Sequence, residues 1–501
     1  NNTGASNTAV GADAMFGNTS GANNTAMGHL AMNCNTTGTV NTAVGMNALL
    51  NNVLCSSNTA VGYNAICGNG TISGYDNTAM GEAALRCVTS GHSNVIMGKY
   101  AGLKNSTAVR NVMLGTCAGY LNTTGSCNTA VGNLALEDNT TGGRNVALGY
   151  QALDNNTTAS FNTALGAQSL FTNTTGANNT AVGLQALYNN TTADNNTAVG
   201  MASLAATTTG YSNTAVGKDA MLTNIGGHTN SALGAAALED NTSGANNTAV
   251  GGLALRCNTT GSNHVAVGCG ALHKSTSGGD NTAVGTQALN NNTTGYRNTS
   301  MGFGAMYTNT TSNSNTAVGY SALTANTTGG SNVAVGTDAL VKNTTGGLNT
   351  AVGKCAGCNI TTGAGNLVFG KLAGADSVFD ITTQSDRAVF GHNSVTNAYV
   401  KVAFTVTSDL RDKTNFGEVP HGLDFVNKLK PVSFQFKKSR DNDTPHGDVR
   451  YGFKAQDILA LEGDNNVIID TEEPNHLKYK GEHLVPVLVN AIKELKAEIE
   501  L

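Results

Sequence analysis

Ser408 and Lys413 are the two residues of this chain whose types and spacing could support covalent chemistry. They open and close the segment Ser408-Asp-Leu-Arg-Asp-Lys413, five positions apart. A serine hydroxyl becomes a nucleophile when a nearby base takes its proton, and a lysine whose pKa is lowered by burial can serve as that base. A serine and a lysine at this spacing are common in any sequence, so the pair alone does not establish a site.

Carboxylates are the second group that could do chemistry. Glu137-Asp138 and Glu239-Asp240 are the best acidic pairs in the first four fifths of the chain. Hydrolysis of a glycosidic bond uses two carboxyl groups that lie roughly 5 to 9.5 Å apart. These pairs would therefore be the place to look for a glycan-degrading enzyme.

The ten cysteines offer little metal chemistry. Cys355-Ala-Gly-Cys358 has the spacing of half a zinc site, but no second Cys/His pair with suitable spacing follows it. We expect structural or free thiols, which fit folding in a reducing cytosol, and neither a metal nor a cofactor.

The chain before residue 371 is built from a repeat of 17 residues. A glycine recurs at this step from Gly11 to Gly370, with one longer step of 19 residues between Gly62 and Gly81. So short a unit cannot bury its own apolar face and must stack on the next, which predicts a mostly β protein, a parallel β-solenoid or β-roll. Within each unit two apolar clusters, such as Ala186-Leu187 and Ala198-Val199, predict two short strands per coil.

The repeat also predicts how the coils hold together. Asparagine stacked on asparagine can form amide ladders. Alanine fills half of the inward positions and Val, Leu and Met supply the bulk, so burial at about 25 cal/mol per Å² gains little against the entropy of ordering a coil. We therefore expect three chains to share one core. We expect outward bulges at the longer step and around Lys99–Arg110, where the Asn-Thr-Thr turn is lost.

The 17-residue spacing places the two acidic pairs too far apart to form one catalytic site. Glu137-Asp138 and Glu239-Asp240 occupy equivalent turn positions six repeats apart, so the two pairs cannot form one dyad. Within a pair, the two adjacent carboxylates are expected to be solvated turn charges.

The composition changes after residue 370. Residues 371–407 alternate apolar and polar residues, for example at Tyr399-Val-Lys-Val402, which predicts strands that leave the solenoid as a neck. Residues 408–501 are predicted to form a separate domain, because charge rises there and all five prolines of the chain lie within it. Its last segment, 485–501, is predicted to be helical.

The terminal helix carries a coiled-coil pattern. Apolar residues step by three and four along one face of it: Val485, Leu488, Ile492, Leu495 and Ile499. Such a seam would hold three chain ends in register. The alternative is a single amphipathic helix packed on its own domain.

Net charge and hydropathy exclude several partners. The net charge is −5 over 501 residues, which indicates neither nucleic-acid binding nor a basic membrane-binding surface. No apolar run is long enough for a membrane span. Because the chain starts at Asn1 within a repeat, we expect it to be a piece of a longer protein that carries an attachment domain before it.

Two resemblances extend these predictions. The Asn-Thr-Ala-Val-Gly box, from about Asn7 to Gly370, resembles the head repeats of trimeric autotransporter adhesins and similar boxes in viral tail fibres. Residues 408–501 resemble the intramolecular chaperone domain of phage endosialidase tailspikes, through Ser408-Asp-Leu-Arg-Asp-Lys413, Gly452-Phe-Lys-Ala-Gln-Asp457 and the closing Ala491-Ile-Lys-Glu-Leu495.

The second resemblance implies a self-cleaving peptidase. It implies a trimerising chaperone that folds the fibre and then cuts the chain between Thr407 and Ser408, with Ser408 as nucleophile and Lys413 as base. Asp409 and Arg411 are expected to hold the loop. Asp412, beside the proposed base, stands where many members of that family have an apolar residue, and its charge would favour a protonated lysine.

Together these features predict a homotrimeric viral fibre or spike shaft that attaches to a host-surface glycan or receptor. We expect it to assemble in the host cytoplasm, to act on the virion surface, and to join other virion proteins through the expected N-terminal region. The alternatives are a glycan-degrading tailspike enzyme, a cellular trimeric adhesin and an ice-binding protein with threonine ladders.

Overall fold

The structure, a computed structural model, describes residues 3–68, 70–376, 379–395, 399, 408–439, 442–464, 466–472 and 474–500. The chain divides into two compact units. The first contains residues 1–367 and 382–388, and the second contains residues 368–381 and 389–501.

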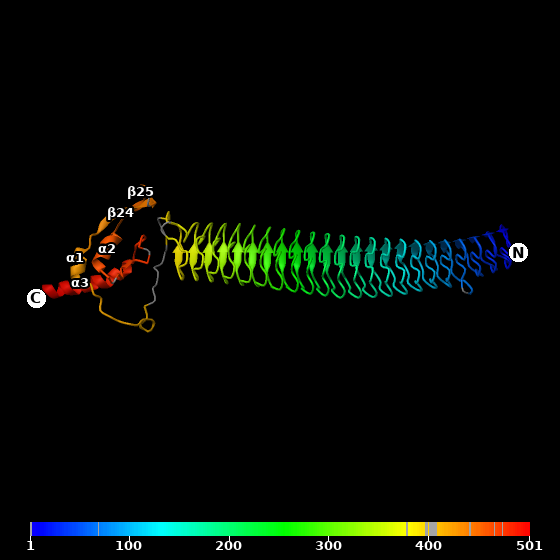
Figure 1. The fold of residues 1–501 in the computed structure, drawn as a ribbon, viewed down its shortest axis with the longest axis horizontal. Coiled ribbons are helices and arrows are strands. Elements are labelled where there is room, and N and C mark those ends of the chain that lie inside the picture. Colours follow the sequence, from blue (N-terminus) through cyan, green and yellow to red (C-terminus); the bar gives the residue numbers. More distant parts are fainter. Residues whose placement is uncertain are drawn as a thin grey trace. The chain divides into compact units, whose positions relative to one another are not determined.

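The first unit is a stack of similar coils, each of which contributes one strand of three residues to a single parallel sheet. Figure 1 shows these strands as a row of arrows that follows the chain order. The strands are β1 (Thr8–Val10), β2 (Thr25–Met27), β3 (Thr42–Val44), β4 (Thr59–Val61), β5 (Thr78–Met80), β6 (Val95–Met97), β7 (Val112–Leu114), β8 (Thr129–Val131), β9 (Val146–Leu148), β10 (Thr163–Leu165), β11 (Thr180–Val182) and β12 (Thr197–Val199). They continue with β13 (Thr214–Val216), β14 (Ser231–Leu233), β15 (Thr248–Val250), β16 (Val265–Val267), β17 (Thr282–Val284), β18 (Thr299–Met301), β19 (Thr316–Val318), β20 (Val333–Val335), β21 (Thr350–Val352), β22 (Leu367–Phe369) and β23 (Ala388–Phe390).

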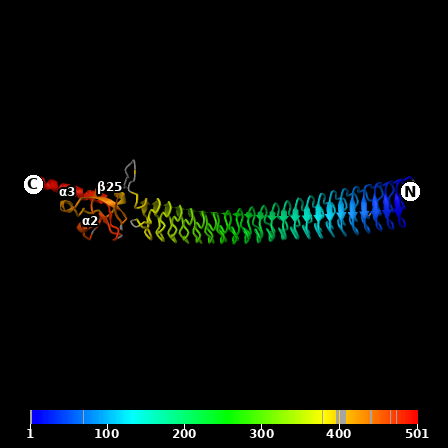
Figure 2. The same cartoon turned by 90° about the horizontal axis from the view of Figure 1, so that it is seen from above.

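The register confirms the repeat. In the coil that contains β11, Thr180 pairs with Thr197, Ala181 with Ala198 and Val182 with Val199. The predicted parallel β-solenoid is therefore confirmed, with about 22 coils. Figure 2 shows the stack of coils gently bowed along its length.

The predicted second strand of each coil is wrong. The segment after Gly183 is a run of turns, because Gln185 and Leu187 have left-handed backbones with φ of 57° and 52°. The N–H groups of these two left-handed residues point to opposite neighbours: Gln185 donates to Ala167 in the coil before and Leu187 donates to Ser203 in the coil after, while Ala186 between them donates to Gly183 in its own coil. The segment thus satisfies its backbone between coils without being extended.

The core of each coil is even thinner than predicted. The middle residue of the strand and the Ala-Leu pair are buried, as Ala181, Ala186 and Leu187 illustrate with no exposure at all. The valine of the strand, predicted to add bulk to the core, lies on the outward face instead, since Val182 alternates with buried Ala181.

Buried asparagines form two ladders along the stack, as predicted. In one ladder, which runs in segments, the side-chain amide of an Asn donates to the side-chain oxygen of the Asn one coil before, for example from Asn156 to Asn139 at 2.7 Å. In the other ladder the side-chain oxygen accepts a backbone N–H, as Asn179 does from Asn196 at 2.9 Å. The same Asn196 side chain donates to the carbonyl of Gly210 at 2.9 Å.

The two predicted irregularities differ. The two extra residues of the longer step lie between Gly68 and Ser73, because Gly68 donates to Arg86 while Ser73 donates to Thr89, back in the ordinary register. Around Lys99–Arg110 the predicted bulge is wrong: these residues form an ordinary coil, and Asn105 takes the buried Asn position. Only the first threonine of the turn is replaced, and the Ser106 hydroxyl donates to the Thr123 carbonyl as a threonine does in other coils.

The segment predicted as a neck is only partly described. Ala388–Phe390 is a strand, β23, but it belongs to the same 23-stranded sheet and so continues the solenoid where the sequence indicated strands leaving it. Val378 and residues 400–407, including Val402 and Thr407, lie outside the described residues. The boundaries at 370/371 and 407/408 remain predictions.

The second unit contains a small α+β fold. It consists of the 3-10 helix η1 (Leu410–Asp412), α1 (Leu423–Lys428), β24 (Val432–Ser439), β25 (Asn442–Gly452), α2 (Ala455–Glu462), β26 (Ile469–Asp470), β27 (Lys478–Tyr479), η2 (Gly481–His483) and α3 (Leu484–Ile499). Strands β24 and β25 form an antiparallel pair, as do β26 and β27. Its core joins α1, α2, β26 and α3 through Phe425, Ile458, Ile468, Ile469, Leu484 and Val487.

The predicted terminal helix is confirmed as α3, and two of its faces are apolar. Leu484, Val487 and Ala491 pack inward and are at most 5 % exposed. The seam residues are on the surface: Val485, Leu488, Ile492, Leu495 and Ile499 are 38–75 % exposed. The helix therefore packs on its own domain, as the alternative interpretation required, and still leaves the seam uncovered.

Candidate functional site

The loop that carries Ser408 and Lys413 is shaped by its charged residues. The Asp409 carboxylate accepts the backbone N–H of Arg411 at 2.9 Å, which caps the single turn of η1. The Arg411 guanidinium forms an ion pair with the same carboxylate at 2.6 Å. This contact lowers the pKa of Asp409. Asp409 and Arg411 thus bond to each other, and their predicted role of holding the loop stays a prediction.

Within this loop the structure brings Ser408 and Lys413 together. After η1 the backbone of Lys413 is extended, with φ −124° and ψ 150°, and its N–H donates to the Leu410 carbonyl. The side chain then returns across the turn, so that Nζ of Lys413 donates to Oγ of Ser408 at 2.5 Å. This is within the reach that a nucleophile and its base require.

The loop is open to solvent in a single chain. Ser408 and Lys413 are both exposed, and so are the apolar Leu410 and Phe416 beside them, at 71 % and 68 %. Thr407, whose carbonyl Ser408 would attack, lies outside the described residues. The burial that would make a lysine a good base is therefore not supplied by this chain alone.

A strap of extended chain, residues 415–421, follows the loop. It covers a cavity of about 520 Å³ that is lined on the other side by Glu462, Ile468, His483 and Val487 among others. Residues 415–420 of the strap are exposed, so the strap is not packed into the core.

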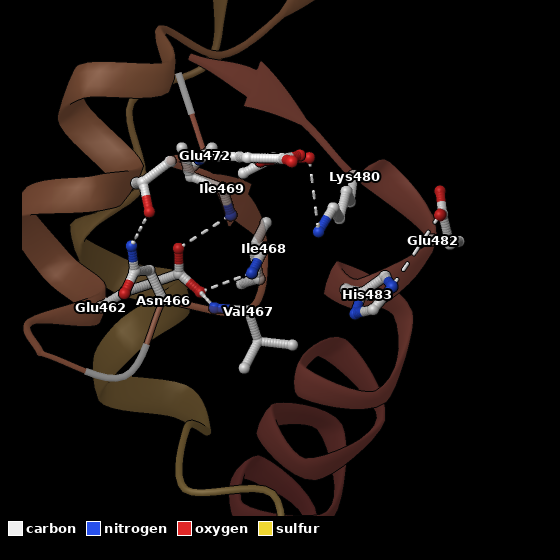
Figure 3. Close-up of polar contacts among 11 residues, drawn as sticks. Glu462, Asn466, Val467, Ile468, Ile469, Glu472, Lys480, Glu482 and His483 are labelled. Atoms are coloured by element: carbon white, nitrogen blue, oxygen red, sulfur yellow. Dashed lines mark hydrogen bonds and ion pairs between the residues drawn. The ribbon is translucent and has the colours of Figure 1, made fainter. Parts of the chain in front are cut away.

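Glu462 lies at the wall of this cavity, and sequence reasoning missed it. Its carboxylate is almost fully buried at the C-terminus of α2 and accepts three consecutive backbone N–H groups, from Val467 at 2.8 Å, Ile468 at 2.6 Å and Ile469 at 3.0 Å (Figure 3). These bonds hold residues 467–469 against the C-terminus of α2. The contact is a structural one, and only a glutamate followed by a Gly-Asp turn hinted at it.

The acidic pairs of the solenoid turn out to have partners in neighbouring coils. Glu239 forms an ion pair with Arg256, one coil later, at 2.6 Å. Burial, and then the neighbouring Glu137, raises the pKa of Asp154, the residue one coil after Glu137, to about 7. The four carboxylates of the two pairs, expected to be solvated, are half-buried, and Asp154, outside these pairs, is only 6 % exposed.

The cysteines differ from the prediction at one position. Cys355 and Cys358, expected to be free or half of a metal site, form a disulfide. Among the described residues, no group of three or more His, Cys, Asp or Glu side chains is placed to hold a metal ion.

Comparison with known proteins bears on the C-terminal residues. Residues 408–467 match a family described as the chaperone of endosialidase. No curated protein matches the chain. No solved structure matches it either. Within the part of the chain that the structure describes, no helix is both long enough and apolar enough to span a membrane.

Proposed function

We propose that this chain is the shaft of a homotrimeric viral fibre or tailspike, and that residues 408–501 are an intramolecular chaperone that drives trimer folding and then cuts itself off after Thr407. The observation that carries the proposal is the match of residues 408–467 to the endosialidase chaperone family, directly after a 23-stranded β-solenoid sheet. Attachment to a host-surface glycan or receptor, and assembly with other virion proteins, belong to the same proposal.

The outward face of the solenoid sheet supports association of several chains. In all 23 strands the last residue is Val, Leu, Met or Phe, and the first is Thr, Ser, Val, Leu or Ala. Both point away from the core, and Leu233 for example is 51 % exposed. With strands about 4.8 Å apart, these two rows make an uncharged strip of roughly 105 by 7 Å, or about 700 Å².

Such a strip is unusual for a protein that stays single. Each partner of a stable interface buries about 800 Å², which is close to the area of the whole strip, and about half of the strip, the row of Val, Leu, Met and Phe, is apolar. Charged residues are present on other faces of the coils, for example Lys99, Arg144 and Lys218, but at neither outward position of the strands. This distribution favours a face that is covered by other copies of the chain.

The exposed seam of α3 supports the same assembly at the other end of the chain. Burial of Leu488, Ile492 and Leu495 between three helices would remove apolar side chains from water that the domain itself leaves uncovered. The proposal also requires that other chains cover the exposed Leu410 and Phe416 and desolvate the Ser408–Lys413 loop.

The proposed cleavage follows from this loop. A neutral Lys413 takes the proton of the Ser408 hydroxyl, and Oγ attacks the Thr407 carbonyl carbon. The bond from that carbon to the Ser408 nitrogen breaks, the nitrogen takes the proton, and an ester between Thr407 and the Ser408 side chain remains. Water then hydrolyses the ester, which gives the Thr407 carboxylate and restores the Ser408 hydroxyl, on a residue whose amino group was freed in the previous step.

The test compares the purified full chain with Ser408→Ala and Lys413→Ala, and uses Lys430→Ala, an exposed lysine of the same domain, as control. We expect the wild type and the control to release residues 408–501 on a denaturing gel, and both site variants to stay intact as trimers in light scattering. An intact wild-type chain would show that self-cleavage is wrong. A monomeric Ser408→Ala variant would show that the trimer is wrong.

A further inference from the structure

The strap between the Ser408–Lys413 loop and α1 is fixed by two polar residues of α3. Nδ2 of Asn490 donates to the carbonyls of Val419 at 3.2 Å and His421 at 3.5 Å. One helical turn later, Oε2 of Glu494 accepts the backbone N–H of Leu423 at 2.6 Å. These bonds join residues that are about 70 positions apart in the sequence.

Glu494 supplies what the start of α1 lacks. The N-cap residue of α1 is Gly422, which has no side chain to accept the free N–H groups of the first turn. The Glu494 carboxylate fills this role from another helix. Any side chain at position 422 would collide with that carboxylate, so Gly422 is the residue that lets Glu494 approach.

Besides these bonds, the last residue of the strap, His421, stacks its ring on Phe425 of α1. The strap lies over the cavity and its residues up to 420 are exposed, so packing does not determine their path. It begins only two residues after Lys413. The turn of η1 sets the Ser408–Lys413 pair locally, whereas the path of the chain that leaves Lys413 depends on where α3 holds it between residues 419 and 423.

From this geometry we propose that Asn490 and Glu494 are positioning residues for the Ser408–Lys413 pair and that, through them, association of the α3 helices sets the cleavage loop in its reactive arrangement. The inference depends on the proposed function. α3 has three faces: Leu484, Val487 and Ala491 pack inward, Asn490 and Glu494 hold the strap, and the seam is left for other copies. A helix fixed by its partners holds the strap more rigidly than a helix that is free at its outer face.

The experiment uses Glu494→Ala, Asn490→Ala and Glu494→Gln in the full chain. The control is Glu498→Ala, which removes an exposed glutamate one turn further along α3. The measured quantities are the rate of release of residues 408–501, the trimer fraction in light scattering, and amide hydrogen exchange of residues 413–423. Because small misplacement of reacting groups is costly, we expect Glu494→Ala to slow release by about tenfold or more with the trimer fraction unchanged.

The conservative variant separates positioning from stability. Glu494→Gln keeps an acceptor for the Leu423 N–H, so we expect it to cleave within about threefold of wild type, as Glu498→Ala does. Unchanged release from Glu494→Ala trimers would overturn the inference. Loss of the trimer in Glu494→Ala but not in Glu494→Gln would assign Glu494 to assembly and also overturn it.

Hydrogen exchange keeps the inference testable if wild type is not cleaved at all. In that case the proposed function fails, and the strap is judged by exchange alone. Faster exchange at residues 413–423 in Glu494→Ala than in Glu498→Ala supports the clamp, while equal exchange contradicts it.

Discussion

In the solenoid a buried side chain meets its partner 17 residues away, as Asn156 meets Asn139, whereas in the C-terminal fold Leu423 meets Glu494 across 71 residues. Each coil of the solenoid has the same few contacts with the coil before and after it, so stability is a sum over neighbours and damage stays local. The C-terminal fold has one small core that joins the first and last helices, and it forms only when distant segments meet. Under the proposed function, the C-terminal fold supplies the defined starting point from which the coils take up a common register.

The largest expected effect breaks the contact between coils. Gly183 has φ +134°, and a Cβ there would lie 2.5 Å from the carbonyl oxygen of Gly200 in the next coil. We expect Gly183→Ala to destabilise the coils around it by more than about 4 kcal/mol, because strain and a backbone collision add. Hydrogen exchange of β10 to β13 measures the effect, and the exchange of α2 and α3 should not change.

Gly252→Ala is the matched control for that substitution. An added Cβ at Gly252 meets only the Ala235 carbonyl oxygen, at 3.9 Å, and equivalent repeats carry alanine. If amide exchange is equally fast in both variants, the repeat glycines such as Gly183 do not set the spacing between neighbouring coils.

The second effect concerns the C-terminal fold. Glu462→Gln keeps the shape of the side chain but removes the charge that accepts three N–H groups, and it places an amide donor against one of them. We expect a loss of about 2 to 4 kcal/mol for the whole fold, because its core is shared by all of its elements. Exchange should rise together in α1, α2 and α3 and stay unchanged in the solenoid; Asp464→Asn, an exposed neighbour, is the control.

The third effect strengthens the solenoid. The ladder ends at Asn190, whose side-chain oxygen is buried without a partner, because the next coil carries Thr207, whose hydroxyl is also buried without a partner. Thr207→Asn should donate to Asn190 and accept from Asn224, which we expect to stabilise these coils by about 1 to 2 kcal/mol. A rise in the melting temperature checks this, and the exposed Thr209→Asn should have no such effect.

The smallest effect is a dependence on pH. The pKa of Asp154 is raised from 3.8 to about 7, so the folded chain binds this proton more tightly than the unfolded chain. Below pH 3.8 both the folded and the unfolded chain hold this proton, so Asp154 does not lower the free energy of unfolding. As pH rises from 3.8 towards 7 the unfolded chain releases the proton first, and the free energy of unfolding falls. We expect Asp154→Asn to change little at low pH and to gain about 1 to 2 kcal/mol above pH 7, measured by thermal melting. A gain that is equal at all pH values, or that Asp13→Asn reproduces, would contradict this origin.

The sequence was sufficient where a pattern repeats. The 17-residue step, the parallel register, the asparagine ladders and the terminal helix follow from periodicity, because stacked coils put equal residues above one another. The Ala186-Leu187 segment was misjudged for a local reason. Leucine disfavours a left-handed backbone, and only the contacts of neighbouring coils impose φ of 52° on Leu187.

Contacts between distant segments could not be predicted from the sequence. Neither the bond of Glu494 to Leu423 nor the placement of Glu462 against residues 467–469 leaves a periodic signal, since each depends on how the whole domain closes. Ser408 and Lys413 were found through a motif, and the structure adds that their side chains meet at 2.5 Å. Their proposed chemistry stays a prediction.

The ladder of asparagine side chains that includes Asn139 and Asn156 has a direction along the solenoid. In every run the amide group of one asparagine donates to the oxygen of the residue one coil earlier, so the side-chain dipoles add head to tail along the stack. Each run ends in a bare oxygen, at Asn52, Asn190, Asn258 and Asn343, where Ile72, Thr207, Ser275 and Ile360 follow. The interruptions divide one long polar column into short segments, which limits the charge that would otherwise accumulate at its two ends.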